Sequence, residues 1–226
     1  MLGCAPSGII SYNCNYSNIV EPDASEPPYD NLTYVRDSQG RTQYSGIKWQ
    51  CVEYARRWWI AEFDLYLLNV PRACDIWTRT FVRRLSDNKY VALKMHDNGA
   101  STVKPAVGDF LIWVKTDEQP VGHIAVVCEV SDTHVRIAEQ NVGNNITWDG
   151  RNYAREFALQ RSEETGAWTV RDDEDPLFGY VELSQMKYRE IGIASICLPQ
   201  FMIICLNLFA LFIMPHSIYL DRVALA

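Results

Sequence analysis

The chain of 226 residues is long enough for one ordinary α/β domain with an additional segment, and its 48% hydrophobic content against 22% charged residues excludes a disordered chain. Its formal net charge of −7 argues against nucleic-acid binding, because phosphate neutralisation requires clustered Lys and Arg. Acidity would suit a cationic substrate such as a polyamine, although many soluble proteins are acidic without such a substrate.

The cysteine spacing indicates whether a metal site is present, and the N-terminal residues indicate where the protein is located. The seven cysteines include no CxxC pair and no Cys/His cluster with zinc-finger spacing, so we expect no metal site. Residues 1–7 lack the basic region and the apolar stretch of a signal peptide. The sequence therefore predicts a cytoplasmic protein without a bound metal.

The first half of the chain contains an irregular arm and then a helix. Residues 1–45 are rich in Gly, Pro, Ser, Asn and Tyr, which predicts short extended pieces joined by loops. From Trp49 to about Phe63 there is neither Gly nor Pro, and apolar residues recur at helical spacing, so we expect a helix that begins near Cys51. A second helical segment is expected at about 74–85.

The second half favours strands. Runs of β-branched and aromatic residues predict strands at 109–115, 123–130 and 134–140, and later runs near 153–160, 167–172 and 178–183 could extend the same sheet. A helix followed by consecutive strands predicts an α+β domain with an antiparallel sheet. We place this domain at 1–190.

The remaining segment, 191–226, differs in composition. Residues 191–214 contain no charge and are numerous enough to span a bilayer. The sequence leaves three interpretations open: a C-terminal membrane anchor, a buried element, or a spurious end to the coding sequence. The anchor would tether the protein to a membrane.

Three residues from separate segments could form a nucleophilic site. Cys51 lies at the predicted helix start, where partial positive charge and free N–H groups favour a thiolate, although a cysteine there is more often a small buried residue. His123 opens a strand and could accept the thiol proton and return it to a leaving amine. Glu139 in the next strand could orient the imidazole, and Asn141 is an alternative for that role.

A fourth candidate precedes the cysteine directly. The side-chain amide of Gln50, together with the backbone N–H of Cys51, could form an oxyanion hole. A helix start favours the same developing negative charge.

The motifs around these residues resemble a known family. KWQCVEYARRW, GHIAVV and VRIAEQN are similar to segments of the amidase domain of glutathionylspermidine synthetase/amidase and of trypanothione synthetases, within the CHAP group of cysteine, histidine-dependent amidohydrolases/peptidases. The opening LGCAPSGIISYNCNYSN and the run GDFLIW also resemble that family. The resemblance covers about residues 2–185 and implies a papain-like fold whose nucleophile helix packs on an antiparallel sheet.

The resemblance also implies a role for each site residue. Cys51 would be the nucleophile, His123 the general base and acid, and Glu139 the orienting carboxylate. Gln50 would donate to the oxyanion.

Two further positions follow from the same motifs. Arg56 in CVEYARR and Asn141 in AEQN would contact the substrate or support the triad. The implied reaction hydrolyses the amide between the glutathione glycine and spermidine through a thioester on the cysteine, without a metal, nucleotide or other cofactor.

The sequence shows no ATP-grasp synthetase segment, so we expect a stand-alone hydrolase of a small glutathione–polyamine conjugate, and no oligomeric state is predicted. One alternative is a CHAP peptidase that acts on peptidoglycan peptides. Another is a non-enzymatic, membrane-tethered or decayed fragment.

Overall fold

The computed structural model describes residues 1–14, 31–142 and 147–183. The apolar segment 191–226 lies outside the described residues, as does the end of the domain that the sequence places at 1–190. Over the described ranges, no helix has both the length and the apolar character needed to cross a membrane.

The N-terminal arm forms two antiparallel hairpins. The first pairs β1 (Gly3–Cys4) with β2 (Ile10–Ser11), and the second pairs β3 (Leu32–Arg36) with β4 (Thr42–Ile47). The described part of the arm therefore contains the short extended pieces that its composition predicts, and the second hairpin is more regular than expected.

The helix α1 (Cys51–Phe63) confirms the helix that the sequence predicts. Gln50 is its N-cap residue, with an extended backbone at φ −75° and ψ 157°, so Cys51 is the first residue with helical geometry. The helix ends at Asp64, which has a left-handed backbone (φ 55°) and donates its N–H to the carbonyl of Ile60.

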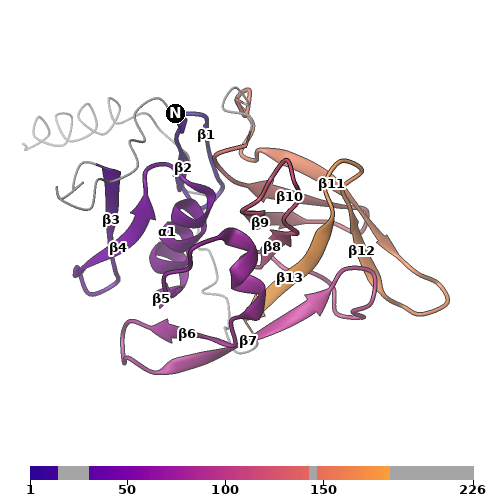
Figure 1. The fold of residues 1–226 in the computed structure, drawn as a ribbon, viewed down its shortest axis with the longest axis horizontal. Coiled ribbons are helices and arrows are strands. Elements are labelled where there is room, and N and C mark those ends of the chain that lie inside the picture. The colour runs from indigo at the N-terminus through magenta and orange to yellow at the C-terminus, as the bar shows by residue number, and fades with distance from the viewer. Residues whose placement is uncertain (15–30, 143–146, 184–226) are drawn as a thin grey trace, which may run out of the picture. The chain divides into compact units, whose positions relative to one another are not determined.

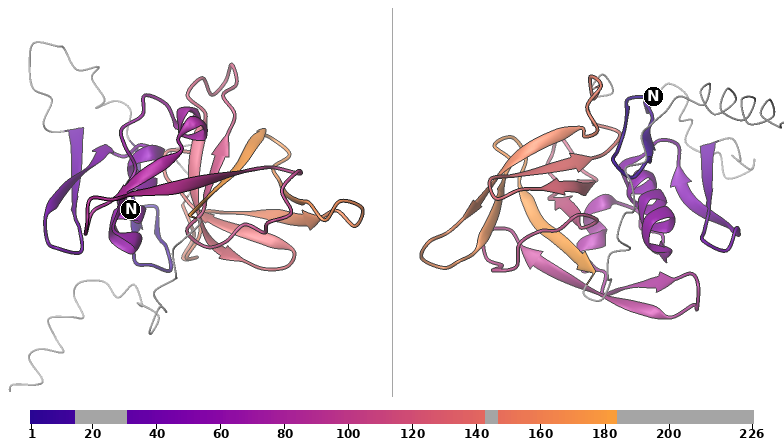
Figure 2. Two further views of the ribbon diagram at one scale, coloured as in Figure 1. Left: turned by 90° about the horizontal axis from the view of Figure 1, so that it is seen from below. Right: turned by 180° about the vertical axis from the view of Figure 1, so that it is seen from behind.

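One face of α1 holds the helix against the neighbouring strands. The Trp59 indole is fully buried, stacks on Phe110 with ring centroids 3.7 Å apart, and donates its Nε1–H to the Gly108 carbonyl at 2.9 Å. The helix contacts β9 (His123–Val130) on one side and the β3–β4 hairpin on the other (Figures 1 and 2). Burial of such an aromatic ring typically contributes about 3–5 kcal/mol, so this contact fixes the helix firmly.

The expectation of a second helix at 74–85 is wrong over most of its length. Only a 3-10 helix, η3 (Ala73–Thr78), is present, and Phe81–Arg84 forms strand β6. β6 turns back at Asn88, which adopts φ 58°, to pair with β7 (Tyr90–Asp97). Pairing with β7 overrides the local helix propensity of this segment.

The described residues form a nine-stranded antiparallel sheet in the order β12-β11-β10-β9-β8-β13-β7-β6-β5. Its strands not yet defined are β5 (Leu65–Tyr66), β8 (Phe110–Trp113), β10 (His134–Ala138), β11 (Arg155–Arg161), β12 (Trp168–Arg171) and β13 (Leu177–Leu183). The strands predicted after Pro105 are thus confirmed, and so is the α+β class with a large antiparallel sheet.

Strand β9 is buried on both faces. Successive side chains of β9 point to opposite faces of the sheet. Ile124 and Val126 pack in the core that includes α1, and Ala125 and Val127 pack in a second core built from strand residues. A strand packed on both faces has little freedom to shift. His123, its first residue, therefore has a rigid support.

Candidate active site

Cys51 lies at the N-terminus of α1, with a free thiol that is 7% exposed. No side chain caps this helix end. Its first backbone N–H groups lack intrahelical partners and carry partial positive charge, which favours a nearby anion such as a thiolate.

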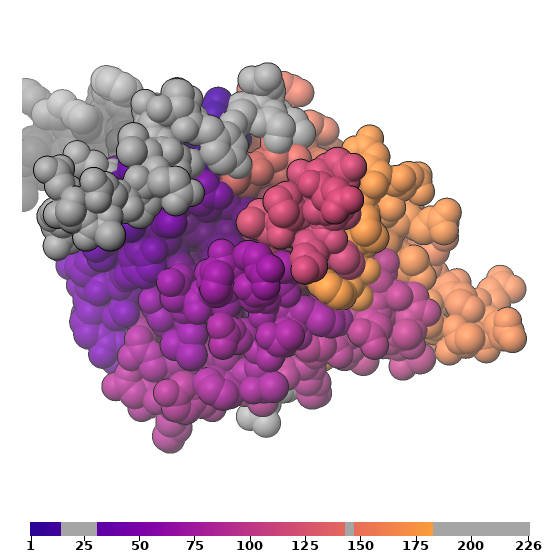
Figure 3. Space-filling view, viewed as in Figure 1, coloured from indigo at the N-terminus to yellow at the C-terminus, as the bar shows by residue number. Residues whose placement is uncertain are grey.

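A cavity of about 290 Å³ opens beside this thiol. It is lined by α1, β4, the loop of residues 69–73 and Val121, and its charged members are Glu53, Arg56 and Arg72. In Figure 3 the surface dips between the violet N-terminal part of the domain and the pink segment that precedes β9. The cavity is large enough for part of a small polar substrate.

His123 is placed by the glycine before it. Gly122 adopts φ 64°, and a Cβ there would lie 2.7 Å from the Trp113 carbonyl oxygen and 3.0 Å from the Cys74 Cβ. Only glycine fits this close approach without displacing the chain. The tight entry into β9 sets the position of the imidazole.

The imidazole joins the thiol to a carboxylate. His123 Nε2 lies 2.8 Å from Glu139 Oε2. The imidazole also interacts electrostatically with Cys51, which raises the pKa of His123. Because Nε2 is engaged by the carboxylate, Nδ1 is the nitrogen left for the thiol. The structure thus brings together Cys51, His123 and Glu139, the three residues that the sequence proposes as a triad.

Electrostatics favour a charged imidazole. Burial alone would lower the pKa of His123, but Cys51 and Glu139 more than offset this and raise it to about 9. At neutral pH the ring is therefore an imidazolium, which can stabilise a thiolate and donate a proton.

Glu139 follows β10 and is almost fully buried. Burial would raise the pKa of this carboxyl, but the charge of Arg155 and the contacts with His123 lower it to about 2. Arg155 donates from Nε to Oε1 at 2.6 Å and from Nη2 to Oε2 at 3.0 Å. The sequence interpretation missed this arginine, since its nearness depends on the pairing of Ile137 with Arg155 across two strands.

Gln50 and Asn141 contact each other next to the thiol. Asn141 Nδ2 donates to Gln50 Oε1 at 2.8 Å, and Gln50 Nε2 donates to the Cys14 sulfur at 3.7 Å. Asn141 adopts a left-handed backbone (φ 66°), which follows directly on the buried Gln140. The amide beside the nucleophile is therefore held in place by the end of the Glu139 segment.

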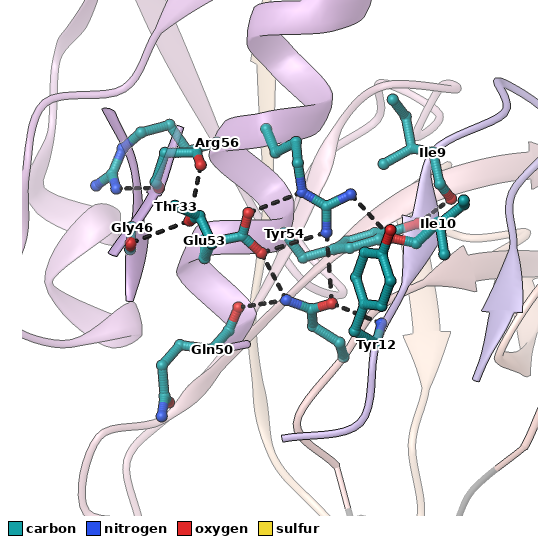
Figure 4. A network of polar contacts seen from close by, with 12 residues as sticks. Ile9, Ile10, Tyr12, Thr33, Gly46, Gln50, Glu53, Tyr54 and Arg56 are labelled. Carbon is teal, nitrogen blue, oxygen red and sulfur yellow. Dashed lines mark hydrogen bonds and ion pairs between the residues drawn. The ribbon is translucent and has the colours of Figure 1, made fainter. Parts of the chain in front are cut away.

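Gln140 connects three parts of the domain. Its Nε2 donates to the Gln50 carbonyl at 3.2 Å and to Glu53 Oε2 at 2.6 Å, and its Oε1 accepts the Tyr12 N–H at 3.0 Å. Figure 4 shows these contacts around Gln50, Glu53 and Tyr12. The sequence interpretation did not select Gln140, although its position between the candidates Glu139 and Asn141 could have marked it as a residue near the site.

Arg56 is fully buried and anchored to the backbone. Nε donates to the Leu67 carbonyl at 2.8 Å, Nη1 to the Ser45 carbonyl at 2.5 Å, and Nη2 to Asn69 Oδ1 at 3.4 Å. Arg56 also lines the cavity beside the thiol. Its contacts connect α1 to the loops that form the cavity wall.

The described residues include no group of three or more His, Cys, Asp or Glu side chains arranged to hold a metal ion. The site brings together a thiol, an imidazolium and several hydrogen-bond donors, which are the groups that nucleophilic catalysis uses.

Comparison with known proteins identifies the surrounding domain. Residues 42–141 match the family model of the CHAP domain. The bifunctional glutathionylspermidine synthetase/amidase of Escherichia coli (strain K12) is 32% identical over 184 residues, which cover 80% of this chain and 28% of that protein.

Two relatives come from Crithidia fasciculata. Its glutathionylspermidine synthase is 30% identical over 194 residues, covering 83% of this chain and 27% of that protein. Its trypanothione synthetase is 35% identical over 133 residues, covering 59% of this chain and 20% of that protein. The chain thus spans less than a third of the length of each of these relatives.

Proposed function

Since residues 42–141 carry a CHAP domain, we propose that this protein is a cysteine-dependent amidase that hydrolyses glutathionylspermidine or a related glutathione–polyamine conjugate. The observation that carries the proposal is the His123–Glu139 hydrogen bond together with the interaction of the same imidazole with Cys51, whose residue lines a cavity. The similarity to a bifunctional glutathionylspermidine synthetase/amidase supports the substrate class.

In the proposed first step, the Cys51 thiolate attacks the carbonyl carbon of the scissile amide. Negative charge moves to the carbonyl oxygen, where the backbone N–H of Cys51 and the Gln50 amide are available as donors. The His123 imidazolium then gives its proton to the amine nitrogen as the C–N bond breaks. The polyamine leaves, and the glutathionyl group remains on sulfur as a thioester.

In the second step, His123, now neutral, accepts a proton from water, and the resulting hydroxide attacks the thioester carbonyl. The C–S bond breaks, the thiolate is restored, and the imidazolium forms again. Glutathione leaves with a free glycine carboxylate. Glu139 keeps its charge throughout and stabilises each imidazolium state.

The papain-like arrangement belongs to this proposal. The nucleophile lies on a helix, the imidazole opens an inner strand of the sheet, and the carboxylate directly follows the neighbouring strand. The net charge of −7 favours the approach of a cationic polyamine conjugate.

The test compares the wild-type protein with Cys51→Ala and, as a matched control, Cys128→Ala. Cys128 is also a buried free thiol, but it lies in the middle of β9 and burial raises its pKa to about 12. We expect release of glutathione and spermidine by the wild type and by the Cys128 variant, and none by the Cys51 variant. Rapid quenching followed by mass spectrometry should detect a glutathionyl adduct on the Cys51 peptide.

Wild-type turnover of glutathionylspermidine no faster than that of Cys51→Ala would contradict the proposal. A parallel assay on bacterial cell walls distinguishes the substrate class, because cleavage of cell-wall peptides without cleavage of the conjugate would point to a peptidase instead.

A further inference from the structure

Five side chains at one end of the sheet form a closed ring of contacts around the carboxylate of the triad. They come from five adjacent strands or the residues that follow them: Trp113, His123, Glu139, Arg155 and Asp172. His123 and Glu139 belong to the proposed triad, Trp113 and Asp172 lie outside it, and Arg155 connects the two pairs.

The contacts of the ring are short and continuous. Arg155 binds both oxygens of Glu139, and its Nη1 lies 3.8 Å from Asp172 Oδ2. Asp172 Oδ2 in turn accepts the Trp113 Nε1–H at 2.9 Å. The Trp113 ring closes the circle, since its centroid lies 5.3 Å from that of His123.

The positive charge of Arg155 compensates the negative charges of two buried carboxylates. The side chains of Glu139 and Asp172 are 3% and 4% exposed, and the guanidinium of Arg155 lies between them. Two carboxylates without a cation between them would be costly in such an environment. The guanidinium also packs over the rings of Trp113 and Phe157, which limits its movement.

We propose that Arg155 is a positioning residue for the amidase reaction: it holds the Glu139 carboxylate toward His123 and supplies the positive charge that the buried site needs. The planar guanidinium grips both carboxylate oxygens, so the carboxylate cannot rotate away from the imidazole. Asp172 and Trp113 fix the other side of the guanidinium. This inference rests on the proposed cysteine chemistry and adds a fourth member to it.

Removal of this charge has a defined direction. A positive charge favours the ionised form of a neighbouring acid, so its loss raises the pKa of Glu139 and makes a thiolate in the same buried site less favourable. The pH at which Cys51 becomes reactive should therefore move upward. With an effective dielectric constant of about 20, a charge at roughly 10 Å shifts a pKa by about one unit.

The experiment measures the rate of Cys51 alkylation by iodoacetamide against pH, followed on the Cys51 peptide by mass spectrometry. This readout needs no amide substrate, so it tests the role of Arg155 even if glutathionylspermidine is not hydrolysed. The variants are Arg155→Gln and Arg155→Lys. The matched control is Arg136→Gln, because Arg136 also bridges two carboxylates, Glu129 and Glu156, on the same sheet outside the ring.

We expect Arg155→Gln to raise the midpoint of Cys51 reactivity by about one pH unit. Arg155→Lys should keep the midpoint at its wild-type value, because the positive charge remains. Its kcat for the conjugate should nevertheless stay several-fold below wild type, because a single ammonium group does not bind both carboxylate oxygens as a guanidinium does. Arg136→Gln should change neither quantity.

An unchanged midpoint in Arg155→Gln would overturn the electrostatic role. Wild-type kcat at every pH in Arg155→Lys would overturn the positioning role. The lysine variant keeps the charge between the two buried carboxylates, so it remains measurable even if the glutamine variant does not fold.

Discussion

Two chains of side-chain contacts among the described residues have the same chemical order, and the first of them lies beside the cavity at the N-terminus of α1. The first joins Cys51, His123 and Glu139. The second joins Ser101, His96 and Glu182: Ser101 Oγ lies 2.8 Å from His96 Nδ1, and His96 Nε2 lies 2.5 Å from Glu182 Oε2. In both chains an imidazole lies between a hydroxyl or thiol group and a carboxylate.

The surroundings of the two chains differ. The Glu182 side chain is 26% exposed, whereas that of Glu139 is 3% exposed and is bound by an arginine. Ser101 Oγ accepts the Val103 N–H at 3.2 Å within a turn, whereas Cys51 lies at an uncapped helix N-terminus. If the proposed function holds, the helix end and the arginine-bound carboxylate, rather than the order of contacts alone, distinguish the first chain from the second.

The largest predicted difference between the two chains concerns the histidines. His123→Ala should lower kcat/KM for the conjugate by about 10³-fold, because it removes both the base and the acid. His96→Ala should leave kcat/KM within about twofold of wild type once the folded fraction is corrected for. Steady-state kinetics with a thermal unfolding control measures both, and equal losses would remove the distinction.

The next largest difference concerns the carboxylates. Glu139→Gln should lower kcat by about 10²-fold and move the alkaline limb of the pH profile below pH 9. The sign follows from His123, whose pKa of about 9 depends in part on the negative charge of Glu139, so the imidazolium loses its proton at lower pH when that charge is removed. Glu182→Gln should leave the limb in place. An alkaline limb that moves upward in Glu139→Gln would contradict this account.

The oxyanion donor predicts a smaller effect. Gln50→Ala should lower kcat by about 10- to 100-fold with little change in KM, since the donor acts on charge that develops in the transition state. Asn141→Ala should lower kcat less, because it only releases the Gln50 amide that it now holds. A rise in KM with unchanged kcat in Asn141→Ala would instead indicate a direct contact with substrate.

The smallest effect is expected when a thiol is placed in the second chain. Ser101→Cys in a Cys51→Ala background should restore no amidase activity. The new thiol should react with iodoacetamide only near the ordinary cysteine pKa of about 8.5. Recovery of turnover would show that an imidazole and a carboxylate suffice, contrary to the comparison of the two chains.

The sequence predicted the elements whose structure is determined by residues close together in the chain. The helix at Cys51 follows from uninterrupted helical spacing. Strand β9 follows from a run rich in Val and Ile, and its bounds, His123–Val130, match the expected range. The β6–β7 hairpin was missed because its strand character comes from pairing. β7 pairs with β13, more than eighty residues further along the chain.

Some residues of the candidate site could likewise be found from the sequence, and others depend on strand pairing. Cys51, His123 and Glu139 could be selected because their residue types and motifs carry the chemistry. Arg155 could not, because a single arginine at the start of a strand has no distinctive pattern. Its role depends on the strand register that sets it opposite Ile137 and on the burial of Asp172.

The assembly of the nucleophile from a helix and the imidazole from a strand also links reactivity to folding. In the unfolded chain Cys51 is separated from His123 by seventy-one intervening residues and reverts to an ordinary thiol. The fast alkylation that the proposed mechanism predicts for Cys51 is then a property of the native state alone. A denaturant titration followed through this single thiol would report the population of the folded domain without any added probe.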